Sequence, residues 1–196
     1  MAIIIIKRHF DTIVKHCRDT YPSEAGGFLG GKGNIILGIF PVPNVANFSL
    51  KSIGTGEDRE VFSHSSWDII KVTEFFKKYD IDLIGLYHSH PNRELPIPSK
   101  QDLIAHRLEN IRIMMIVSLT ADKKARVAAY ETAPGLSREK LTVVRDEAIH
   151  KYLKPYLIQK DIGKSVEEYL KEMKKLEKRI GSIISEHGEK KRNTRP

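Results

Sequence analysis

The sequence predicts an α/β protein in which a mixed β-sheet is flanked by helices. Apolar runs of strand length interleave with segments whose apolar residues recur three or four positions apart, and hairpins are indicated at both ends of the domain. From Asp146 the composition changes to helix formers and dense charge, which predicts a helical extension. We therefore expect a domain over residues 1–145, a helical and partly heptad-like extension over 146–187, and a basic disordered tail over 188–196.

The first part of the chain predicts a strand, a helix and a hairpin. Residues 3–6 are all isoleucine and suit a strand, and residues 8–20 carry apolar side chains at helical spacing. One of these is Cys17, which we expect in the core and not as a nucleophile. Glycines punctuate the apolar strand predicted over 24–33, which implies a close approach by another backbone or a ligand. A strand over 34–40 completes the hairpin.

The rest of the domain predicts two helices and four strands. Residues 41–60 are rich in Pro, Gly, Asn and Ser and indicate an irregular segment beside the sheet. The next segment resembles a capping box followed by one apolar helical face. In chain order we expect a helix through 65–79, a strand over 83–87, a helix over 99–110, and strands over 111–119, 125–131 and 141–144.

The C-terminal extension has apolar residues alternately three and four positions apart, a heptad pattern of about three repeats. A coiled coil of that length is marginal alone. Two uses stay open: residues 162–187 pair with a second copy or with a partner's helix, or they fold back on the domain.

Composition narrows the location and the partners. The net charge of +8 admits an anionic partner, but charge speaks to solubility and non-specific association. No zinc finger, phosphate-binding loop or aromatic-interleaved basic motif accompanies it, so nucleic acid is a minor hypothesis. A single cysteine excludes an intrachain disulfide and fits a reducing cytoplasm. No apolar run suits a signal peptide or reaches the roughly 18 residues of a membrane span. We therefore expect a cytoplasmic protein that does not associate with a membrane.

Two histidines and a downstream aspartate predict a metal site. His88 and His90 follow the apolar run over 83–87, and alternate residues of a strand point the same way. Prolines keep the next segment extended, and Ser99 has the position of a helix N-cap whose first turn carries Asp102. A carboxylate thereby returns towards the histidines. Three such ligands leave one tetrahedral position open, as in catalytic zinc sites.

These residues belong to a wider pattern. Glu24 before Ala25-Gly26-Gly27, together with His88-Ser89-His90-Pro91 and Ser99-Lys100-Gln101-Asp102, resembles the JAMM motif of the prokaryotic MPN-domain (Mov34/JAB1-like) zinc metalloproteases. The resemblance covers about residues 3–145. It implies a curved mixed β-sheet with helices packed around it, of the cytidine-deaminase-like kind. One departure is the loop over 91–98, whose eight residues are one more than the family pattern has.

The resemblance also implies a function. Family members hydrolyse peptide or isopeptide bonds, commonly at the C-terminal tail of ubiquitin-like proteins, and prokaryotic members are associated with sulfur carriers. On the matching positions His88, His90 and Asp102 are the Zn2+ ligands, and Glu24 is the general base that acts through the zinc-bound water. Ser99 stabilises the oxyanion, although a plain N-cap is an equally good interpretation and the serine can serve both roles.

One competing function is a non-catalytic MPN scaffold that binds partners through the C-terminal helices. Intact ligand residues argue against it, because a scaffold does not need them. Metal content separates the two hypotheses. His64 and His106 are expected outside the ligand set, because nothing in the sequence pairs them with it.

Overall fold

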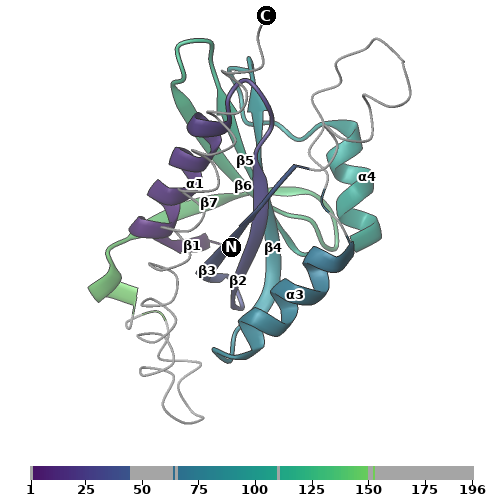
Figure 1. The fold of residues 1–196 in the computed structure, drawn as a ribbon. Coiled ribbons are helices and arrows are strands. Elements are labelled where there is room, and N and C mark those ends of the chain that lie inside the picture. Colours follow the sequence, from purple (N-terminus) through teal and green to yellow (C-terminus); the bar gives the residue numbers. More distant parts are fainter. Residues whose placement is uncertain (1, 45–63, 65, 110, 150–151, 153–196) are drawn as a thin grey trace, which may run out of the picture.

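Three α-helices lie between the strands in the computed structural model, which describes residues 2–44, 64, 66–109, 111–149 and 152 (Figure 1). The prediction of an α/β protein with a mixed sheet flanked by helices is confirmed. In chain order the elements are β1 (Ala2–Ile6), α1 (Lys7–Thr20), β2 (Gly26–Lys32), β3 (Ile35–Val42), α3 (Ser66–Lys77), β4 (Asp82–Pro91), α4 (Lys100–Glu109), β5 (Ile113–Leu119), β6 (Ala125–Glu131), β7 (Ser137–Val144) and the 3-10 helix η1 (Asp146–Ala148).

The sheet closes on itself into a barrel with the strand order β1-β3-β2-β4-β5-β6-β7. Strand β1 runs parallel to both β3 and β7, and β4 runs parallel to β5. The remaining neighbours are antiparallel. The family resemblance implies a curved sheet, and here the sheet curves until it closes, because β1 pairs with both β3 and β7.

The closing strand is apolar along its whole length. Ile3, Ile4, Ile5 and Ile6 are all buried. A strand that is covered on both faces needs a continuous apolar run in place of alternation, and β5 has the same character with seven consecutive buried residues. Burial on both faces therefore explains why these two segments show no period of two in the sequence.

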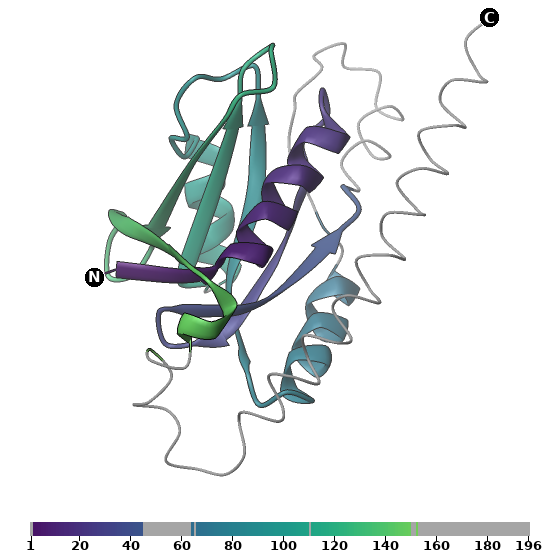
Figure 2. The ribbon, with the colours of Figure 1, turned by 90° about the vertical axis from the view of Figure 1, so that its left-hand side faces the viewer.

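Helices cover both sides of the barrel wall. Helix α1 lies on one side and α4 on the other, with α3 packed along β4 and β3 (Figures 1 and 2). Cys17 on α1 is fully buried, as expected of a core residue. Leu103 of α4 packs against a separate apolar cluster on β5 and β6. That cluster consists of Met114, Ile116, Ala128 and Tyr130.

Three strands extend at least two residues further than the sequence predicts, and one of them is β3, which ends at Val42 and not at residue 40. Strand β4 continues past the expected end at residue 87 and includes both histidines and Pro91. It does so because β5 pairs with it in parallel up to the Pro91–Leu119 position, and the strand ends before Asn92, whose φ is 56°. Strand β7 begins at Ser137, before the expected residue 141, because its first residues pair with β6.

Several predictions fall on residues that the structure does not describe. The first two residues of the irregular segment expected over 41–60 belong to β3, and its residues 45–60 lie outside the described residues. Nearly all of the extension expected over 146–187 and the whole tail expected over 188–196 lie outside them as well. The domain boundaries, the heptad pairing over 162–187 and the basic tail therefore stay predictions. Among the described helices, none has the length and apolar character needed to cross a membrane.

Glycines allow β2 to approach its neighbours, as their positions in the sequence predict. A Cβ on Gly31 would overlap the carbonyl oxygen of Ile35 at the irregularity in the β2–β3 pairing. A Cβ on Gly27 would lie 2.6 Å from the carbonyl oxygen of Phe40. Both obstacles are backbone atoms, which cannot rotate away, so the pairing requires glycine at these positions.

The Gly31→Ala substitution tests this close approach. We expect the free energy of unfolding to fall by about 1–3 kcal/mol, because the backbones of β2 and β3 must separate. Gly135→Ala is the matched control, since a Cβ there meets nothing within 4 Å, and we expect a change within about 0.5 kcal/mol. Urea unfolding measures both, and equal midpoints would show that β2 and β3 are not in tight contact.

Candidate metal centre and active site

Strand β4 places two histidines at the same face of the barrel wall. His88 pairs with Ile116 and His90 with Ser118 on β5, and two-residue spacing on a strand directs both imidazoles the same way. Only 5% of His88 and 3% of His90 is exposed to solvent. Pairing with β5 therefore holds both histidines, pairing with β2 also holds His88, and both side chains are withdrawn from bulk water.

The first turn of α4 brings Asp102 to the histidines. Ser99 precedes the helix, its hydroxyl oxygen accepts a hydrogen bond from the Asp102 N–H at 3.2 Å, and its own N–H donates to Asp102 Oδ2 at 2.6 Å. This reciprocal pair is the capping arrangement that satisfies two backbone N–H groups at a helix start. Ser99 is thus an N-cap, and the same contact fixes the direction of the Asp102 carboxylate.

The loop over residues 91–98 follows a defined path in spite of its additional residue. The Arg93 N–H donates to the Leu119 carbonyl at 3.1 Å. The Glu94 carbonyl accepts from the Ser118 hydroxyl at 3.2 Å, and the Pro96 carbonyl accepts from the Tyr130 hydroxyl at 2.7 Å. These bonds tie the loop to β5 and β6, so Ser99 and Asp102 are delivered to the site from a fixed starting point.

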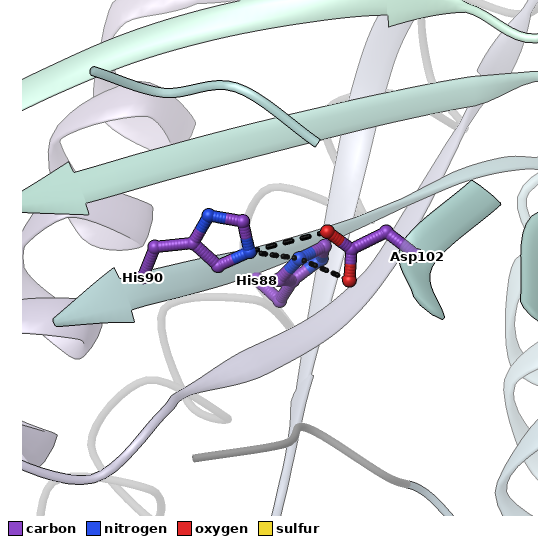
Figure 3. Close-up of side chains that lie close together, drawn as sticks. All are labelled: His88, His90 and Asp102. Atoms are coloured by element: carbon purple, nitrogen blue, oxygen red, sulfur yellow. Dashed lines mark hydrogen bonds and ion pairs between the residues drawn. The ribbon is translucent and has the colours of Figure 1, made fainter. Parts of the chain in front are cut away.

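Three polar side chains converge from β4 and α4 (Figure 3). His88 Nε2 lies 3.2 Å from Asp102 Oδ1, and His90 Nε2 lies 3.2 Å from Asp102 Oδ2. The two Nε2 atoms are 3.1 Å apart. In a tetrahedral zinc site with bonds of about 2.0–2.1 Å, neighbouring ligand atoms are about 3.3 Å apart. The three side chains are thus already spaced as ligands of one ion.

Burial and hydrogen bonding set the protonation states of this cluster. Burial opposes ionisation of Asp102, but hydrogen bonds from His88 and His90 outweigh it and hold the pKa of the carboxyl well below its ordinary value. Burial lowers the pKa of His90, and the hydrogen bond with Asp102 only partly offsets this effect. Near neutral pH, Asp102 is therefore a carboxylate and His90 is a neutral imidazole, which are the forms that bind a metal.

The donor set and its surroundings fit zinc. Two imidazole nitrogens and one carboxylate form the one group among the described residues in which at least three potential ligands lie within 4.8 Å of one another, and zinc accepts these donors in catalytic sites. His90 Nδ1 is buried and has no hydrogen-bond partner among the described residues. An unsatisfied buried imidazole is costly, and a metal ion bound to Nε2 would offset that cost.

Glu24 lies two residues before β2, the strand that pairs with β4. The β2–β4 pairing sets Gly26 opposite His88, and Ala25 and Ser89 are hydrogen-bonded one position further along. The next step of this register places Glu24 opposite His90. Only 6% of Glu24 is exposed, so its carboxylate is not a solvated loop side chain.

The other histidines whose side chains the structure describes lie outside the ligand set. The His64 ring packs edge-on against Phe28, with 4.9 Å between the ring centroids. The His106 side chain lies outside the described residues. His9 and His16 are on α1, where burial lowers their pKa values to about 3 and about 4 respectively.

The sequence did not predict the contact between Ser89 and Ala25, because no periodic pattern marks a serine between two histidines as a partner of a distant residue.

The family assignment agrees with this geometry. Residues 7–131 match the sequence profile of the family described as Prok-JAB, prokaryotic homologs of the JAB domain. The chain belongs to this family. The matched segment begins with α1 and ends with β6, so it contains every residue of the candidate site.

The individual proteins that resemble this chain have low sequence identity to it. Over 98 residues, the chain is 29% identical to the desampylase of Haloferax volcanii, in a match that covers 47% of this chain and 63% of the relative. The chain therefore spans less than two thirds of the length of that protein. A solution structure of the Desulfitobacterium hafniense protein DSY2949 has a TM-score of 0.55 at 20% identity, covering 74% of this chain and 94% of the other. A Salinibacter ruber protein has a TM-score of 0.51 at 22% identity, covering 73% and 92%. These two structures share the fold.

Metal titration tests the ligand set. We expect metal-free protein to bind about one Zn2+ per chain, and Asp102→Asn to weaken binding by more than about 100-fold, because losing a ligand costs more than losing an outer partner. Asparagine keeps an oxygen that can accept from Ser99, so the helix cap survives. Asp122→Asn, in the exposed β5–β6 turn, is the control. Competition with a chromophoric chelator measures all three, and equal affinity in parent and Asp102→Asn would exclude Asp102 as a ligand.

Proposed function

We propose that this protein is a zinc-dependent metallopeptidase that hydrolyses peptide or isopeptide bonds at the C-terminal tail of ubiquitin-like or sulfur-carrier proteins. The observation that carries the proposal is the convergence of His88, His90 and Asp102 at ligand spacing in a chain of the prokaryotic JAB family. The similarity to a desampylase supports a hydrolase and a ubiquitin-like substrate.

His88, His90 and Asp102 would hold the zinc ion. When bound, zinc would supply Lewis acidity, which lowers the pKa of a bound water to about 7. The chain's own contribution begins with Asp102, which is ionised and oriented by Ser99 before any ligand arrives. Pre-oriented ligands reduce the reorganisation that binding requires, so the site is ready for a metal in its resting state.

Glu24 is proposed as the general base. It is buried just before β2, the strand that pairs with the histidine strand β4, and there a carboxylate can accept a proton from the attacking water and later donate it to the leaving amine. Proton transfer of this kind contributes roughly 10²–10⁴ in rate. The low solvent exposure of Glu24 keeps competing water away from the transferred proton.

Ser99 is proposed to stabilise the developing oxyanion in addition to capping α4. Its oxygen accepts from the Asp102 N–H, which leaves the hydroxyl hydrogen available for donation. A hydroxyl held in this way can donate to a substrate carbonyl oxygen as negative charge develops on it. The two interpretations of Ser99 are therefore compatible, because they use different atoms of the same hydroxyl.

The route of the substrate tail is restricted by the sheet. Strand β4 is paired with β2 on one side and β5 on the other. A tail therefore cannot add as a new strand beside the histidines, and strand addition, if it occurs, uses another segment. The exposed Leu95 and Ile97 on the loop before α4 flank the site and are available for apolar contact with the tail.

Cleavage of a ubiquitin-like fusion tests the proposed chemistry. We expect Glu24→Gln to bind zinc as the parent does and to lower kcat by about 10²–10⁴-fold, because the amide cannot accept the proton. Glu74→Gln, at an exposed position of α3, is the matched control and should leave kcat unchanged. Product masses identify the bond. A Glu24→Gln protein that holds zinc and cleaves at the parent rate would exclude Glu24 as the base.

A further inference from the structure

The chain on both sides of Glu24 is hydrogen-bonded to β4 or to the residue that follows it. Before it, the Tyr21 hydroxyl donates to Asn92 Oδ1 at 2.6 Å. After it, the Ala25 N–H donates to Ser89 Oγ at 2.9 Å, and the Ser89 N–H donates to the Ala25 carbonyl at 2.8 Å. Glu24 therefore lies between two hydrogen-bonded contacts, one to Ser89 before His90 and one to Asn92 after it.

In the contact between Ala25 and Ser89, a side-chain hydroxyl takes the place of a backbone acceptor. A hydrogen-bonded antiparallel pair normally exchanges two main-chain bonds. The Ala25–Ser89 pair has one main-chain bond and one bond to the Ser89 hydroxyl oxygen. Both residues are buried, with 2% and 0% exposed. Without the hydroxyl, the Ala25 N–H would be left buried without an acceptor, which a folded chain avoids by moving.

The Ser89 side chain lies on the other face of β4 from the metal cluster. Alternation along the strand directs Ser89 away from His88 and His90 and towards α1. Cys17 of α1 forms a hydrogen bond with Ser89, which opposes the rise in the Cys17 pKa that burial causes. Ser89 is thus neither a ligand nor in contact with the reacting atoms, and any effect on the chemistry passes through Ala25.

We propose that Ser89 is a positioning residue for Glu24. The inference rests on the proposed function, in which Glu24 is the base. The Ser89 backbone lies between the two histidine ligands, and its hydroxyl fixes the residue that follows the base. One residue of β4 thereby sets the distance between the proton acceptor and the metal ligands, from the face of the strand that the substrate does not reach.

Hydrogen exchange tests the contact between Ala25 and Ser89 without substrate or metal. In metal-free parent protein, we expect the Ala25 amide to exchange slowly, at a rate close to those of the β2 amides. In Ser89→Ala it should exchange at least tenfold faster, while the amides of β5 keep their parent rates. An Ala25 amide that is unprotected in the parent, or equally protected in Ser89→Ala, would overturn the proposal even if the variant is too unstable for kinetics.

Kinetics test whether the same contact serves the base. We expect Ser89→Ala to bind about one zinc ion per chain and to lower kcat by about 10–100-fold, with KM changed less than about threefold, because a small displacement of a catalytic group costs rate more than binding. Ser89→Thr keeps the hydroxyl and should recover most of the lost kcat. Equal impairment of Ser89→Ala and Ser89→Thr would overturn the role of the hydroxyl.

Cys17→Ala is the matched control, because it removes the other hydrogen bond of the same hydroxyl and leaves the Ala25 bond. We expect a lower melting temperature and a parent kcat. If Cys17→Ala loses kcat as Ser89→Ala does, the effect is loss of packing between α1 and β4, and positioning is excluded. The same variants separate the two proposals. If the proposed function is wrong, Glu24→Gln keeps full activity. If only this inference is wrong, Glu24→Gln is inactive and Ser89→Ala is fully active.

Discussion

The antiparallel pairing of β2 with β4 is the constraint on which the rest of the site depends. Its register sets Gly26 opposite His88 and continues through the Ala25–Ser89 hydrogen bonds. Glu24 and the histidines, some sixty residues apart in sequence, thereby become neighbours. A shift by one residue would send Glu24 to the other face of the sheet. The glycines of β2 serve the other edge of the same strand, because they permit the close backbone approach of β3.

The second organising feature is that Asp102 has two roles with one carboxylate. It accepts from the backbone of Ser99 at the start of α4 and lies 3.2 Å from each histidine. A helix start favours negative charge because its N–H groups are unsatisfied. An ionised Asp102 therefore both stabilises the start of α4 and supplies the negative charge that a cation site needs.

The two faces of β4 separate chemistry from packing. His88 and His90 face the side of α4, where a small apolar cluster adjoins them, whereas Tyr87 and Ser89 face α1 and the main core. The Tyr87 hydroxyl lies 2.9 Å from His16 Nδ1, so polar groups at the core end of this face also have partners. Alternation along one strand thus couples the rigidity of the core to the geometry of the metal cluster.

The sequence by itself determined the element order, the mixed α/β class, the core position of Cys17 and the set of residues that form the candidate site, because these follow from local periodicity and from a motif of fixed spacing. It did not determine closure of the barrel, the extension of β4 to Pro91 or the tie between Ser89 and Ala25. Those features depend on pairing between segments that are distant in the chain, such as β1 with β7, and a local pattern is compatible with several partners. Only the tertiary structure selects one partner, because each hydrogen-bonded register excludes its alternatives through the burial of every side chain on the strand.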